Sequence, residues 1–132
     1  MEEQDKKCQD LLEDEEYWKK DMLYMRSCYP KRAKNFVTLL GDICDRMEYE
    51  NSPMLIAYPD KESIYRMVEQ IYGQNERKGK EKEDPFYVFD VPAQTEAEKI
   101  ELLEKELLLV LLCDEMHRRR MRHYRRKKYI KS

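Results

Sequence analysis

Glycine and proline are scarce in this chain, whose 132 residues include only three glycines and five prolines. β-Sandwiches and barrels need many turn residues, so this scarcity argues against both. Charged residues make up 41% of the chain, against about 25% in a typical globular domain. A chain of this length forms one domain. The composition therefore predicts a small all-α domain whose narrow apolar core lies beneath long charged side chains.

The sequence also lacks a membrane-spanning segment and a secretory signal. No apolar run approaches the ~20 residues that cross a bilayer, and the first five residues, MEEQD, are acidic and polar. Four cysteines are present without a C-x-x-C motif, at wide and irregular spacing. We therefore expect a cytoplasmic protein with reduced thiols rather than disulfides. These cysteines are Cys8, Cys28, Cys44 and Cys113.

Patterns that carry catalysis or metal binding are largely missing. Cys113 and His117 are four residues apart and share a helix face, but a tetrahedral site needs two further ligands and no second Cys/His pair exists. Neither histidine follows a glutamate by three residues, as di-iron helical bundles require. There is no glycine-rich phosphate loop, and no local group activates a cysteine nucleophile. We expect a non-enzymatic protein without a metal or cofactor.

Apolar periodicity predicts four helices. The expected ranges are 9–27, 30–50, 60–72 and 95–129, with residues 1–8 frayed. Tyr29-Pro30 separates the first two helices, and Gly73 is the expected C-cap of the third. The organisation by segment is then an N-terminal helix (1–28), a two-helix unit (29–73), a connecting segment (74–94) and a long helix with a basic tail (95–132). The predicted fold is a bundle of three to four helices.

The connecting segment 74–94 contains a charged loop followed by the aromatic run FYVF at residues 86–89. Pro85 and Pro92 bound this run, which favours an extended conformation. One interpretation is that it folds back over an edge of the core. The other is that it is an adhesive peptide that docks in a partner's groove.

The last helix changes character along its length. Thr95 and Glu98 form a capping box that marks its start. Segment 107–113 is apolar all round, so we expect it to be enclosed on most sides or to form an oligomer interface. A helix that reaches Tyr129 is about 50 Å long at ~1.5 Å per residue. Its basic end should then project past the bundle.

Charge is strongly segregated along the chain. All 28 acidic residues lie in 1–116 with 17 Lys and Arg, giving −11, whereas 117–132 carry nine Lys and Arg and no acid, giving about +9. This basic end has three interpretations: phosphate contact with nucleic acid or the ribosome, pairing with acidic helices of the same or another chain, and, less favoured, an anionic membrane surface. The residues concerned are Arg118, Arg119, Arg120, Arg122, Arg125, Arg126, Lys127 and Lys128.

A polar layer is predicted where the second helix ends. Asp45, Glu48 and Glu50 lie at its C-terminus, where carboxylates oppose the helix dipole. The arginines at 118–120 are the obvious counter-charge. We expect the region of Glu48 to lie near Glu115 and these arginines, at the end of the apolar core.

Several motifs occur together in this chain. Tyr29-Pro30 opens a helix, CDRMEYE occupies residues 44–50, YPD occupies 58–60, and LLCDEMHRRR occupies 111–120. Over about half its length the chain resembles a group of short uncharacterised proteins of anaerobic Firmicutes, the clostridia and their relatives. That group pairs a Cys-Asp-x-Met-Glu-Tyr helix with an arginine-rich C-terminal helix. Here the tail has no cysteine, and Asn51-Ser52-Pro53 replaces a glycine turn. The resemblance implies a bacterial, cytoplasmic protein and brings no activity with it.

Together these patterns favour a small helical adaptor or structural protein that acts through protein contacts, including contacts with further copies of itself. The alternative is a protein that associates with nucleic acid or the ribosome through its basic tail.

Overall fold

The computed structural model describes residues 2–49, 52–76 and 95–130. Within these ranges it contains four α-helices, one short 3₁₀ helix and no strand. The helices are α1 (Glu2–Ser27), α2 (Lys31–Met47), η1 (Pro53–Leu55), α3 (Lys61–Glu76) and α4 (Glu96–Ile130). The predicted small all-α fold with a long C-terminal helix is confirmed. The aromatic run at 86–89 and its connecting segment lie outside the described residues.

Local sequence accounts for several helix boundaries. Thr95 caps α4, since its Oγ1 accepts a hydrogen bond from the backbone N–H of Glu98 at 3.0 Å. Asp60 precedes α3 and accepts from the N–H of Ser63 at 3.3 Å. Pro30 stands just before α2, where its missing N–H leaves no hydrogen bond unmade.

Three predicted boundaries were wrong. α1 begins at Glu2 rather than Gln9, with Glu2, Glu3 and Asp5 placed favourably in its first turn. α2 ends at Met47, because Glu48 already has a non-helical backbone (φ −87°, ψ 78°). α3 runs through Gly73 to Glu76 without a left-handed cap. A single glycine costs a helix only about 1 kcal/mol, so this helix continues through it.

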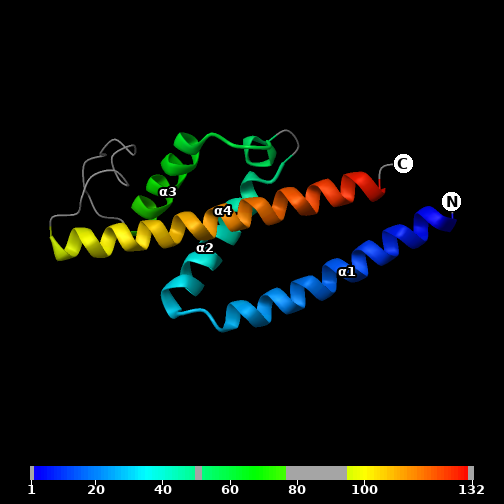
Figure 1. Cartoon of the computed structure of the whole chain (residues 1–132), viewed down its shortest axis with the longest axis horizontal. Coiled ribbons are helices and arrows are strands. Elements are labelled where there is room, and N and C mark those ends of the chain that lie inside the picture. The colour runs from blue at the N-terminus through cyan, green and yellow to red at the C-terminus, as the bar shows by residue number, and fades with distance from the viewer. Residues whose placement is uncertain (1, 50–51, 77–94, 131–132) are drawn as a thin grey trace.

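Helix α4 is the element on which the others pack. α1, α2, α3 and η1 each contact it. Figure 1 shows α2 passing behind α4, α3 beside its first half, and α1 running back along its basic half, so that both chain ends lie at one end of the molecule. The basic end of α4 was expected to project past the bundle. This expectation was wrong, because α1 lies alongside that end.

The buried core lies between α4 and the α2–η1–α3 segment. On α4 it uses Leu108, Leu112 and Met116, which are spaced four residues apart and face one side. Met54 of η1, in a stretch expected to be only a connector, is 1% exposed. The core residues are Phe36, Leu40, Cys44, Met54, Val68, Ile71, Tyr72, Leu108, Leu112 and Met116.

Segment 107–113 is enclosed over most of its circumference but not all of it, since Leu107, Leu109 and Leu111 are partly buried against the core. Leu108 is fully buried, but Val110 is 64% exposed and Cys113 is also exposed. The reason is geometric, because α2 and α3 cover one side of α4 and no described element covers the opposite side.

The core assignment can be tested with two matched leucines. Leu108→Ala should lower the free energy of unfolding by about 2–5 kcal/mol, because it removes a fully enclosed side chain. Leu23→Ala on α1, where leucine is 58% exposed, should change it by less than about 0.5 kcal/mol. Urea unfolding followed by circular dichroism measures both. Equal losses in the two variants would contradict this core.

Candidate functional site

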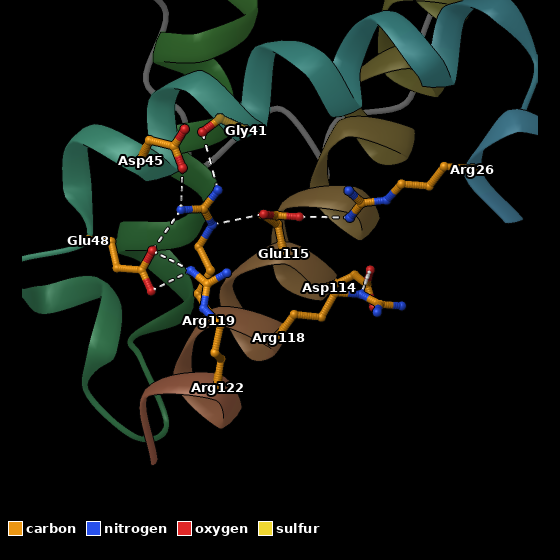
Figure 2. A network of polar contacts seen from close by, with 9 residues as sticks. All are labelled: Arg26, Gly41, Asp45, Glu48, Asp114, Glu115, Arg118, Arg119 and Arg122. Carbon is orange, nitrogen blue, oxygen red and sulfur yellow. Dashed lines mark hydrogen bonds and ion pairs between the residues drawn. The ribbon is translucent and has the colours of Figure 1, made fainter. Parts of the chain in front are cut away.

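Arg119 lies at the centre of a cluster of charged side chains on the face of α4 that meets α2 (Figure 2). Its Nη1 is 2.8 Å from Asp45 Oδ1 and 2.9 Å from Glu48 Oε2. Its Nε donates to Glu115 Oε1 at 2.8 Å, and its Nη2 donates to the carbonyl oxygen of Gly41 at 3.3 Å. The Arg119 side chain is only 8% exposed. We call Arg119 with Asp45, Glu48 and Glu115 the arginine network.

The placement of these residues follows from the two helices. Glu115 and Arg119 are one turn apart on α4, so they share a face. Asp45 and Glu48 stand at the C-terminal end of α2, where carboxylates are unfavourable beside the negative end of the helix dipole. A guanidinium compensates both carboxylates and also donates to a carbonyl oxygen, Gly41 O, of the same helix. The arginine network therefore closes the polar end of the core.

Two further arginines extend the arginine network. Nη2 of Arg122 reaches both carboxylate oxygens of Glu48, at 2.9 and 2.7 Å. Nη2 of Arg26 donates to Glu115 Oε2 at 2.8 Å, from α1. Side chains of α1, α2 and α4 thus meet at one site (Figure 2). Glu115 bridges two helices because its two oxygens bind different arginines.

Helix α1 has a second attachment nearer the C-terminus of α4. Arg126 Nη2 pairs with Glu15 Oε2 at 2.7 Å. The guanidinium of Arg125 stacks on the Trp18 ring, 4.7 Å from its centroid. The sequence analysis did not identify Glu15, Trp18 or Arg26 as functional residues. The signal that could have found them is the order of charges in α1, acidic in its first turn and with Arg26 in its last, which complements an antiparallel α4.

The remaining predicted basic residues divide into two groups. Arg118 pairs with Asp114 one turn earlier, at 2.7 Å, and Arg120 donates to the carbonyl oxygen of Ile56 at 2.9 Å. Lys127 and Lys128 lie exposed near the end of α4. Glu50, predicted in the polar layer, lies outside the described residues.

Electrostatics at Arg119 reflect two opposing effects. Burial acts to lower the pKa of the guanidinium, whereas the hydrogen bonds to Glu115 and Asp45 raise it, and the net direction is upward. Arginine is charged at every ordinary pH in any case. Its charge is therefore permanent, and the carboxylates around it have a fixed counter-charge. Removing one member of such a buried group exposes the other charges to a poorly solvated environment.

Cys44 lies in the core beside the arginine network and is fully buried. Burial raises the pKa of its thiol from the ordinary 9.0 to about 11, and the nearby Arg119 offsets only part of that effect. Because the thiolate is the reactive form of cysteine, this group is a poor nucleophile at neutral pH. Its surroundings are those of a packed side chain.

The described parts of the chain were also compared with the requirements of a metal site and of a membrane-spanning helix. No group of three or more His, Cys, Asp or Glu side chains there is arranged to hold a metal ion. Among the helices that the structure describes, none combines the length and apolar character needed to cross a bilayer. Comparisons with protein-family models, curated proteins and solved structures gave no match to this chain.

The arginine network predicts a large difference between neighbouring arginines. Arg119→Met should lower the free energy of unfolding by about 3 kcal/mol, the low end of the cost of breaking a buried charge pair, because the mostly buried Glu48 and Glu115 lose one guanidinium and keep only Arg122 and Arg26. Arg118→Met, which removes an exposed pair 43% open to solvent, should cost at most about 1 kcal/mol. Chemical denaturation monitored by circular dichroism gives both values. A loss at Arg119 no greater than that at Arg118 would contradict the structural role.

Cysteine labelling tests the burial of the site. In the folded protein at pH 8, iodoacetamide should modify the exposed Cys28 and spare Cys44. Labelling of Cys44 should require opening of the core, because its sulfur is closed to solvent and burial raises the pKa of the thiol. Peptide mass mapping distinguishes the sites, and labelling in denaturant provides the control. Modification of both cysteines at equal rates in the folded protein would be inconsistent with this environment.

Proposed function

We propose that the protein is a non-enzymatic helical adaptor or structural protein that acts through protein–protein contacts. This proposal rests on the partners that the C-terminal arginines bind. Arg119, Arg122 and Arg126 each bind a carboxylate of α1 or α2 rather than facing solvent together as a phosphate-binding surface. Their charge supports the assembly of the fold.

Exposed apolar side chains supply a surface for such contacts. Leu12, Leu23 and Met25 of α1 are each more than half exposed, as are Leu103 and Val110 of α4. Single exposed apolar residues are ordinary, but several along the same helix mark an interaction surface. Many charged groups of this small domain bind one another, and some of its apolar side chains remain exposed. Such a surface is suited to docking on other proteins.

The resemblance to the clostridial group supports a bacterial protein of the cytoplasm. The same resemblance supports the view that its partners are intracellular proteins.

Binding of nucleic acid or the ribosome is the second candidate. Its support is that Lys127 and Lys128 lie exposed at the end of α4, next to Arg125. This segment is short and its contacts would be independent of base sequence. Such binding would be weak and strongly dependent on salt.

Two measurements separate these functions. Fluorescence anisotropy of the full chain with a labelled RNA and a labelled DNA duplex should give dissociation constants no tighter than about 10⁻⁴ M at physiological salt, the weak limit of non-specific binding. Tighter binding that is lost in a Lys127→Ala/Lys128→Ala variant would favour the second candidate.

The adaptor proposal also predicts what accompanies the native protein. Protein partners, including further copies of the chain, should be recovered after chemical crosslinking in the producing cells and should withstand nuclease treatment. A Leu103→Glu/Val110→Glu variant should lose partners of the α4 surface, whereas Lys127→Ala/Lys128→Ala should keep them. Recovery of nuclease-sensitive material alone would contradict the adaptor.

A further inference from the structure

Helix α4 has two apolar faces, and the fold uses only one. Leu108, Leu112 and Met116 are buried against α2 and α3. A second set of residues, spaced alternately by three and four, runs along the other side. In the view of Figure 1, no described helix lies in front of α4. This second set, the exposed stripe, comprises Ile100, Leu103, Leu107, Val110, Asp114, His117, Met121 and Tyr124. Within it Leu107 and Asp114 are half-buried, and Leu107 also packs against the core.

The apolar members of the exposed stripe are unusually open to solvent. Leu103 and Val110 are both 64% exposed, and Ile100 and Tyr124 are also more than half exposed. The stripe extends over about 36 Å of helix at ~1.5 Å per residue. Its spacing is the a/d repeat of a coiled coil, which seats a second helix of similar length. The occupant that fits is therefore another long helix.

The distribution of charge along α4 indicates which long helix would pack on the exposed stripe. Among the side chains of α4 that stay exposed in the protomer, Glu96, Glu98, Lys99 and Glu106 lie toward its start, and Arg118, Lys127 and Lys128 lie toward its end. The exposed charge is therefore net acidic at the start of the helix and basic at its end. Two copies of α4 side by side in parallel would place the basic ends together. In the antiparallel orientation, each basic end meets the acidic start of the other copy. The helix is thus complementary to itself in one orientation only.

A single antiparallel register keeps every stripe position in contact. Ile100 then opposes the partner's Tyr124, and Leu103 opposes the partner's Met121. Leu107 opposes the partner's His117, and Val110 opposes the partner's Asp114. Each pair occurs twice, as two-fold symmetry requires. The polar residues at two stripe positions favour a unique register over a slipped one, at a cost in stability.

Two charge pairs accompany this register. Glu106, which is exposed, comes beside the partner's Arg120, and Glu96 comes opposite the partner's Lys128. The same register places Lys99 beside the partner's Lys127, where like charges repel. The apolar contacts of the stripe, rather than these flanking charges, therefore select the register.

We propose that two copies of this chain associate through the exposed stripes of α4 as an antiparallel helix pair. The inference rests on the proposed function, protein–protein contact, and names the partner as a second copy of the chain. The arginine network and the dimer surface then occupy opposite faces of one helix. The core face holds the protomer together, and the outer face joins the protomers.

The oligomeric state of the full chain gives the first test. Sedimentation velocity at micromolar concentration should give a mass of twice 16.2 kDa. Leu103→Glu/Val110→Glu should be monomeric, with self-association weakened about 100-fold or more, and should keep its helix content because both sites are exposed. Leu23→Glu on α1 is the matched control and should remain dimeric. A monomeric wild-type chain, or a dimeric Leu103→Glu/Val110→Glu variant, would overturn the proposal.

Disulfide trapping tests the orientation. The background carries Cys8→Ala, Cys28→Ala and Cys113→Ala, with the buried Cys44 retained. Under mild oxidation, a mixture of Leu103→Cys and Met121→Cys chains should form the mixed covalent dimer, because these positions oppose each other across the pair. Leu103→Cys alone should not form a covalent dimer, since its two copies lie far apart. Efficient crosslinking of Leu103→Cys alone would show a parallel pair and overturn the proposed orientation.

These outcomes separate the dimer from the broader function. A monomeric chain that still loses a cellular protein partner when Leu103→Glu/Val110→Glu is introduced would refute the dimer and leave the adaptor intact. The stripe would then belong to that partner. A monomeric chain without any protein partner would refute both.

Discussion

The guanidinium of Arg119 is the interaction on which the rest of the structure depends. It binds Asp45 of α2, Glu48 just after that helix and Glu115 of its own helix, and its own side chain is nearly closed to solvent. Through Glu115 it is linked to Arg26 of α1. Without this charge, the mostly buried Glu48 and Glu115 would keep only Arg122 and Arg26, and Asp45, which is 70% exposed, would lose its contact with Arg119. A chain with so many charged residues can still form a narrow apolar core, because the charged side chains beside that core are paired with side chains of opposite charge.

The two faces of α4 have different roles in this arrangement. Its inner face supplies the apolar core and the arginine network, so the helix is the common surface for α1, α2 and α3. Its outer face repeats apolar residues, of which Ile100, Leu103, Val110 and Tyr124 are each more than half exposed. A helix that is apolar on both sides is costly to leave in water. The physical requirement to cover the outer face is the basis for the proposed self-association.

The sequence predicted the helices and much of the polar end of the core, but not which faces would be covered. Glu48 and Arg119 are 71 residues apart. The helix-dipole argument still indicated that the carboxylates ending α2 needed a cation, and the arginine run was the main source. By contrast, an all-round apolar segment such as 107–113 does not say which side is buried, because each side has the same hydrophobicity. Met54 and Arg26 were missed for a related reason, since no periodic pattern surrounds either contact and only the three-dimensional path of the chain brings them to α4.

The central claim is that the arginine-rich end of α4 is the internal counter-charge of the fold. A double-mutant cycle between Glu48 and Arg119, measured by chemical unfolding of the wild type, the Glu48→Gln and Arg119→Met variants and the double variant, tests it most directly. The expected coupling free energy is about 0.5–3 kcal/mol, the range found for residues that share one salt-bridge network. A coupling free energy within about 0.3 kcal/mol of zero, the scatter seen for independent sites, would contradict it.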